Sequence, residues 1–283
     1  MTHAERARPG SERKLREVFF SSAVELTPYL AVEAGEELFF VATDDAGLGR
    51  QLFVKGIRKD MAHLGMAVGL LEELGLRSAG STFVEVGANI GTTTVTALRR
   101  HHFGRGVALE PAPANFRVLR LNLVANEVDS DVTALQVAVA DTEEERPLAL
   151  SGKSSGAHVL APGVPKNPAS TVVVQAVTLD GLVARGVVDP AAVGLLWIDA
   201  AGHETEVIAG ASLLVGAGVP LVTALRPRSE NWPRKKESLL RLLAGYTDFA
   251  ELRAKARPAS DLGGLLDAIE MRGTNLLACR MTS

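Results

Sequence analysis

Short apolar runs alternate with helical segments from Thr82 onwards. Such runs occur in STFVEVGANIG, GRGVALEPAP, VTALQVAVAD, VGLLWIDAAG and VPLVTALRP, and each is followed by a turn or a helix opener. Continuous apolar runs of this length are typical of parallel strands buried on both faces. Helical segments such as TTTVTALRRHH and PANFRVLRLNLVAN lie between them. This β-α-β-α order predicts an α/β fold with a doubly wound, mostly parallel sheet that binds its ligand at the carboxyl ends of the strands.

The sequence before Thr82 predicts a smaller N-terminal part. Residues 1–20 form a polar tail that we expect to be poorly ordered. Beyond Val24, the runs ELFFVAT and RQLFV flank the turn signal DDAGLG, which predicts two short strands. The helical spacing of MAHLGMAVGLLEELGL follows. We therefore divide the chain into a tail (1–20), an N-terminal cap of short strands plus a helix (21–78) and the α/β domain (79–283).

Two later segments depart from the regular alternation. Residues 142–175 are rich in Gly, Ser, Pro and Lys, as in SGKSSGAH and APGVPKNPAS, which predicts a hairpin or mobile loop over the ligand edge. Near the end of the chain, YTDFAELR and TNLLACR predict two closing strands around a helical or loop segment.

Composition excludes several classes of protein. The 283 residues are 47% apolar and carry a net charge of −3, without a basic block. We therefore expect a small-molecule partner, with no nucleic acid and no membrane surface bound. Cys279 is the single cysteine, which excludes an internal disulfide. The N-terminus lacks a continuous apolar region and no apolar stretch reaches about 18 residues, so we expect a cytoplasmic protein.

The turn VEVGANIGTTTV narrows the choice of ligand. Gly87 and Gly91 are four residues apart, and Glu85 precedes the first by two. The nicotinamide-dinucleotide pattern G-x-G-x-x-G is absent, and no lysine follows Gly91 as a phosphate-binding P-loop would require. The remaining common user of such a strand, acid and glycine turn is a protein that binds S-adenosylmethionine.

The chemistry of these residues agrees with that choice. Gly87 permits a backbone conformation and a close ligand approach that a Cβ would block, and Asn89 tolerates left-handed dihedral angles. Glu85 can lie near the positive amino group of the ligand. Glu110, at the end of the next strand, can accept hydrogen bonds from both ribose hydroxyls. The plainer alternative is a tight turn with two solvated acids, but the acid–turn–acid series favours a cofactor site.

With these residues in view, the chain resembles the FkbM-type methyltransferase family, which is S-adenosylmethionine-dependent and Rossmann-like (class I). The resemblance covers about Thr82 to Pro227. It depends on FVEVGANIG, ALEPAPANFRVLRLNLVAN, VAVADTEEERPLAL, VTLDGL and WIDAAGHETEVIAGA.

The resemblance implies methyl transfer to a hydroxyl of a small natural product, sugar or related metabolite. It assigns Glu110 to the ribose, Ala138 to Asp141 to the border of the adenine ring, and Asp199 to the sulfonium and the acceptor. The glycine turn would hold the methionine part of the cofactor through Glu85, Gly87, Ala88, Asn89 and Gly91.

Two positions depart from the family pattern. Ala201 stands where the family has the middle carboxylate of Asp-Val-Glu-Gly-His-Glu, and Ala224 stands where the family tends to have a glutamate. Both lie on the acceptor side. They keep open a second hypothesis, a catalytically degenerate scaffold that binds S-adenosylmethionine. A nicotinamide-dependent oxidoreductase is a third, which the missing glycine disfavours.

Catalysis needs alignment above all, with a base as a secondary aid. His203 could take the proton of an alcohol at neutral pH, or could simply cap or pack at the start of a helix. Asp199 could orient the hydroxyl or accept the proton itself. Glu204 is a favourable acid in the first turn of that helix. We expect no metal, because no complementary His or Asp pair supports these three donors.

Overall fold

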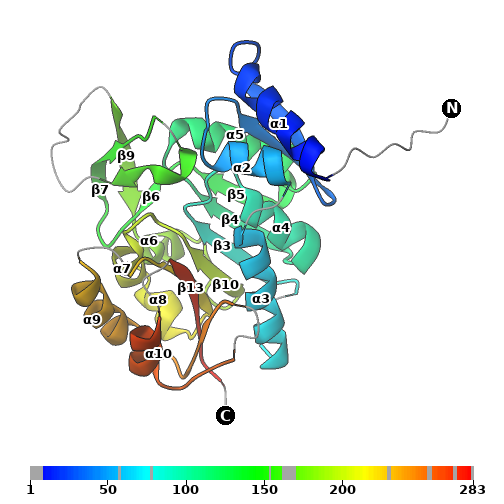
Figure 1. The fold of residues 1–283 in the computed structure, drawn as a ribbon. Coiled ribbons are helices and arrows are strands. Elements are labelled where there is room, and N and C mark those ends of the chain that lie inside the picture. Colours follow the sequence, from blue (N-terminus) through cyan, green and yellow to red (C-terminus); the bar gives the residue numbers. More distant parts are fainter. Residues whose placement is uncertain are drawn as a thin grey trace.

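The computed structural model of the protein describes residues 9–56, 59–76, 79–152, 154–160, 170–227, 231–253, 257–269 and 273–281. A central sheet lies between two layers of helices, with the N-terminal segment and a second sheet beside it (Figure 1). Over these residues, no helix is long and apolar enough to cross a membrane.

The central sheet contains seven strands in the described part of the chain, in the order β12-β13-β11-β10-β3-β4-β5. The strands from β11 to β5 are parallel, and β13 is antiparallel to both β11 and β12. The predicted doubly wound, Rossmann-like class I fold is therefore confirmed, including the two closing strands. The strands are β3 (Thr82–Val86), β4 (Arg105–Leu109), β5 (Val132–Leu135), β10 (Val193–Ile198), β11 (Leu221–Leu225), β12 (Asp248–Glu251) and β13 (Thr274–Cys279).

Alternate side chains along the strands are buried on opposite faces of this sheet. Val84 and Leu196 pack under α6 to α10, whereas Phe83 and Leu195 pack against α3. Helices α4 and α5 continue the second layer. The helices are α3 (Lys59–Glu73), α4 (Thr92–His101), α5 (Pro113–Ala125), α6 (Leu179–Ala184), α7 (Glu204–Ala209), α8 (Ser212–Gly216), α9 (Trp232–Leu242) and α10 (Leu262–Ala268).

The N-terminal segment differs from the expectation in two places. ELFFVA forms β2 (Glu37–Ala42), but it pairs with β1 (Tyr29–Ala34), and RQLFV lies in helix α2 (Leu48–Lys55). The strand prediction for RQLFV is wrong because Asp45 accepts hydrogen bonds from the backbone N–H groups two and four residues later and so opens a helix.

Part of the expected polar tail is also helical. Helix α1 (Pro9–Ala23) covers residues 9–20, which the sequence indicated to be poorly ordered, while residues 1–8 lie outside the described residues. Phe20 explains the difference, since it is buried in a core shared with the hairpin and α2.

The segment after β5 builds a second sheet in the order β6-β9-β7-β8, seen at the left of Figure 1. The predicted hairpin is confirmed by the antiparallel pairing of β7 with β9, and residues 161–169 lie outside the described residues. A short 3-10 helix, η1 (Asp129–Asp131), precedes β5. The second sheet comprises β6 (Ala138–Val139), β7 (Glu144–Ala149), β8 (Val159–Leu160) and β9 (Thr171–Val177), with a 3-10 turn η2 (Ser155–Ala157) before β8.

Candidate active site

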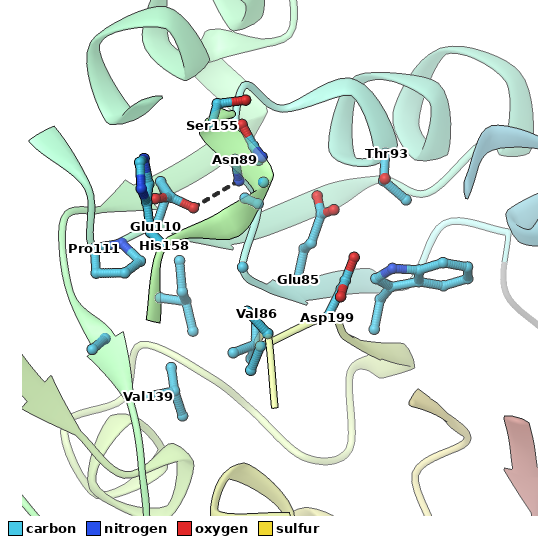
Figure 2. A pocket seen from close by; sticks show the side chains of 18 of the residues that line it. Glu85, Val86, Asn89, Thr93, Glu110, Pro111, Val139, Ser155, His158 and Asp199 are labelled. Carbon is cyan, nitrogen blue, oxygen red and sulfur yellow. Dashed lines mark hydrogen bonds between the residues drawn. The ribbon is translucent and has the colours of Figure 1, made fainter. Parts of the chain in front are cut away.

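A cavity lies at the carboxyl edge of the central sheet, where the strand order reverses between β3 and β10. This is the position predicted for the ligand. Residues beyond the strand ends line it, together with residues of α2, α3, η2 and β8. In Figure 2, Glu110 and His158 lie toward one end of the cavity, and Glu85 and Asp199 lie toward the other.

The glycine turn after β3 has the predicted unusual backbone. Gly87, Asn89 and Gly91 have φ values of 80, 52 and 83°. A Cβ on Gly87 would lie 2.2 Å from the carbonyl oxygen of Asp199. The sequence attributes this glycine to its backbone conformation and to a close ligand approach. Gly87 does line the cavity, and the carbonyl of Asp199 at the end of β10 also lies where a Cβ would be, so the fold itself requires glycine at this position. Gly91 ends the turn as the N-cap of α4 and does not line the cavity.

Glu110 lines one end of the cavity and is held there by hydrogen bonds. Its Oε2 accepts a hydrogen bond from the Asn89 backbone N–H at 2.8 Å, and its Oε1 accepts from Ala112 N–H at 2.9 Å and from Asn115 Nδ2 at 3.3 Å. Burial raises the pKa of Glu110 to about 7, although these three hydrogen bonds oppose the shift. Among the described residues, Oε2 accepts from one donor, so it has a lone pair that can accept a second hydrogen bond.

Glu85 supplies a second buried carboxylate toward the opposite end. It lies on β3, is 3% exposed and lines the cavity. Its Oε2 accepts a hydrogen bond from the hydroxyl of Thr94 in α4, which fixes its orientation. A buried carboxylate at this place suits a cationic amino group, which would compensate for its lost hydration.

Asp199 follows β10 and lines the same end of the cavity. Its backbone N–H donates to the Val86 carbonyl at 3.0 Å, and its Oδ1 accepts from Arg226 Nη2 at 3.0 Å. Ala201, two residues later, also lines the cavity and has φ 46°, a value that is uncommon for a residue with a Cβ.

His203 and Glu204 lie away from the cavity lining. His203 is the N-cap of α7, and its Nε2 is 2.9 Å from the Leu160 carbonyl, so this nitrogen donates to the carbonyl. Glu204 accepts from the Gly202 N–H at 2.9 Å. Arg226 pairs with both carboxylates, with Asp199 Oδ1 at 3.0 Å and with Glu204 Oε1 at 3.9 Å. The described residues contain no group of three or more His, Cys, Asp or Glu side chains that could hold a metal ion.

Of the residues predicted to border the adenine ring, Ala138 to Asp141, the structure places the first at the cavity and the last outside it. Ala138 lines the cavity, as does Ala88 of the glycine turn. Asp141 does not, because β6 pairs with β9 and carries the following residues away from the central sheet. The Asp141 carboxylate is exposed and pairs with Arg146 at 3.4 Å.

The structure also brings residues to the cavity that the sequence did not indicate. Asp60 reaches it from α3, Leu48 from α2, and Ser155 and His158 from the second sheet. Helical periodicity marked α3 without showing which polar residue faces a ligand. The Gly- and Ser-rich segment that contains Ser155 and His158 was predicted to lie over the ligand edge, but its composition did not show which of its side chains face the cavity. No sequence signal short of the folded arrangement would have selected these residues.

The strand order, the glycine turn and the two buried carboxylates define a Rossmann-like methyltransferase. More particularly, residues 85–254, more than half of the chain, match the family described as "Methyltransferase FkbM domain", and the chain belongs to this family. It is therefore an S-adenosylmethionine-dependent methyltransferase, which decides against the nicotinamide alternative.

Other known proteins are similar at a greater distance. An O-methyltransferase from Bacillus cereus in complex with SAH is 12% identical, with a TM-score of 0.42 over 79% of this chain and 82% of that chain. The METTL16 methyltransferase domain is 10% identical, with a TM-score of 0.49 over 98% and 81%. An rRNA methylase from Streptococcus thermophilus is 8% identical, with a TM-score of 0.44 over 80% and 98%. No curated protein sequence matches the chain.

The cavity fits the family's cofactor. Its glycine turn has no lysine for a phosphate, while Glu110 offers an acceptor for the ribose and Glu85 a countercharge for the amino group. Apolar residues that line the same cavity, including Val139 and Leu148, suit a flat adenine ring.

Proposed function

We propose that this enzyme methylates a hydroxyl of a small natural product or sugar-like metabolite, rather than a nucleic acid or a membrane component. The observation that carries the proposal is the pair of carboxylates, Asp60 and Asp199, on the cavity that also holds Glu85. Carboxylates orient hydroxyl donors and can take their proton. The net charge of −3 also argues against a polyanionic acceptor.

In methyl transfer, the protein holds the methyl donor and orients the acceptor. When bound, S-adenosylmethionine supplies an electrophilic methyl group on a sulfonium. The glycine turn, Glu85 and Glu110 hold this donor in place, so that an acceptor oxygen can approach along the line of the breaking bond. Asp199 orients the acceptor hydroxyl and receives its proton. Arg226, which donates to Oδ1, keeps that carboxylate directed.

The test begins with calorimetric binding of S-adenosylmethionine and of S-adenosylhomocysteine. The enzyme is then incubated with S-adenosylmethionine and a panel of hydroxylated metabolites. Mass spectrometry measures S-adenosylhomocysteine formation, and NMR of the product locates the methyl group. An oxygen-bound methyl supports the proposal. A methyl on nitrogen or carbon contradicts it, and cofactor binding without turnover across the panel favours the scaffold alternative.

Asp199→Asn tests the role of the carboxylate. We expect kcat to fall by at least about tenfold, as for loss of a general base, while the affinity for S-adenosylhomocysteine changes little. Asp267→Asn is the matched control, because Asp267 pairs with Lys236 on the far helical layer. If Asp199→Asn is as active as the Asp267→Asn control and the wild-type enzyme, Asp199 takes no part in catalysis.

A further inference from the structure

The buried side chain of Asp45, just before α2, forms hydrogen bonds with η2 of the second sheet. Asp45 is 6% exposed and accepts four hydrogen bonds. Two come from the backbone N–H groups of Gly47 and Gly49, at 3.0 and 2.7 Å. The other two come from Ser155, from its N–H at 3.2 Å and its hydroxyl at 2.6 Å. Through Asp45, the turn before α2 is therefore hydrogen-bonded to η2.

The same serine is connected to the end of the cavity that Glu110 lines. Asn115 Nδ2 donates to the Ser155 carbonyl at 3.0 Å and to Glu110 Oε1 at 3.3 Å. Ser155 and Gly156 line the cavity beside Asn89. This hydrogen-bonded segment thus forms a wall of the cavity near Glu110, as Figure 2 shows for Ser155 and Asn89.

His158 is a further polar residue of this wall. It lines the cavity, and its Nδ1 accepts a hydrogen bond from the Ser151 backbone N–H at 2.9 Å. Burial lowers the pKa of His158 below 6.5, so the ring is neutral at neutral pH. Since Nδ1 is the acceptor, the single ring proton is on Nε2.

We propose that His158 binds the adenosine part of S-adenosylmethionine through its Nε2–H donor, and that Asp45 and Ser155 position it. Adenine ring nitrogens are acceptors, and they match a neutral imidazole donor. His158 lies with Glu110, Pro111 and Val139, away from Glu85 and Asp199 (Figure 2). The inference concerns the cofactor alone and is independent of the acceptor proposed above.

Two ligands and two substitutions test His158. The ligands are S-adenosylhomocysteine and 5′-methylthioadenosine, which lacks the amino acid part. His158→Phe keeps a planar ring without the donor and should weaken both ligands by the same factor, about 2- to 12-fold for one neutral hydrogen bond. His158→Gln, whose amide nitrogen can occupy a similar place to Nε2, should restore most of the affinity. Unchanged affinity for both ligands, or loss for S-adenosylhomocysteine alone, would overturn the proposal.

Ser155→Ala tests the positioning contact. We expect both ligands to dissociate several times faster, with the free energy of unfolding little changed. Ser212→Ala is the control, because Ser212 makes a similar serine–aspartate bond at 2.5 Å to Asp180. If Ser155 acts through His158, the double variant Ser155→Ala/His158→Phe should bind no more weakly than His158→Phe. Additive losses, or dissociation from Ser155→Ala as slow as from the control, would contradict positioning through His158.

Discussion

Glu110 shows how one buried side chain sets the pH response of a binding site. Its pKa is raised to about 7 by burial. We propose that the ribose hydroxyls of the cofactor donate to the ionised carboxylate, so that ligand binding favours the charged form and lowers this pKa. Below pH 7 the free protein holds a proton that binding must release. Affinity should therefore weaken as the pH falls through 7.

We expect the affinity for 5′-methylthioadenosine to decrease between pH 8 and pH 6, with a limiting slope of about tenfold per pH unit. This ligand has no amino or carboxyl group to titrate, and burial lowers the pKa of His158, which reduces its protonation in this range. Calorimetry across the range measures the slope. Glu110→Gln should bind more weakly at pH 8 and show a flat profile. A flat profile for the wild-type protein would show that Glu110 does not bind the ribose.

Residues whose role depends on local spacing could be predicted from the sequence. Asn89 has the expected positive φ, and Glu110 lies at the cavity because a parallel strand brings its carboxyl end to the same edge as β3. His158 and Asp60 could not be predicted, because contacts between distant segments place them. The sequence identified Gly87 as a site residue but did not show that the backbone at the end of β10 also requires glycine there.

At the scale of elements, side chains of α5 form hydrogen bonds with the edge of the N-terminal hairpin, where a further strand would otherwise pair. Asn122 and Asn126, one turn apart, pair their side-chain amides with the backbone of β2. Each amide oxygen accepts from a strand N–H, at Phe40 and Leu38, and each amide nitrogen donates to the carbonyl of the same residue. These bonds satisfy an edge that would otherwise be open to other chains. The sequence NLVAN does not reveal this, because asparagines four apart on a helix also suit a solvated face.

The two asparagines make the same pair of hydrogen bonds to β2 and differ in the further acceptor that each amide nitrogen reaches, which makes them a matched pair. Asn122 Nδ2 also donates to the Ile90 carbonyl in the glycine turn at 2.7 Å, whereas Asn126 Nδ2 donates to the carbonyls of Leu38 in β2 and of Asn122 in its own helix. Either alanine substitution should lower the free energy of unfolding by about 1–3 kcal/mol, because backbone groups of β2 lose their partners. Only Asn122→Ala should also weaken S-adenosylhomocysteine binding severalfold.

Urea denaturation and calorimetry on both variants measure these effects. Equal loss of affinity in the two would mean that the hairpin as a whole, and not the contact with Ile90, supports the turn. Unchanged stability in both would show that water satisfies β2 when the amides are absent.

At the scale of the whole molecule, three parts of the chain build one site. The sheet edge supplies Glu85, Glu110 and Asp199, the N-terminal segment supplies Asp60 and Asp45, and the second sheet supplies His158. The N-terminal segment also shares a hydrophobic core with the glycine turn, in which Phe39 and Leu52 are buried together with Ile90. A part with no independent core is not expected to unfold by itself.

We therefore expect ligand binding to stabilise the N-terminal hairpin as much as the central sheet. S-adenosylhomocysteine at 100 times its Kd should raise the free energy of unfolding by about 2.7 kcal/mol. Hydrogen exchange with mass spectrometry can follow peptides covering residues 29–42, 82–91 and 274–281 in the free and bound protein. The slowest amides of all three should gain the same protection, because they open in the same global transition. If the hairpin peptide exchanges at a lower free energy that the ligand does not change, the N-terminal segment opens independently, and its contacts at Asp45 and Asn122 do not hold it to the folded sheet.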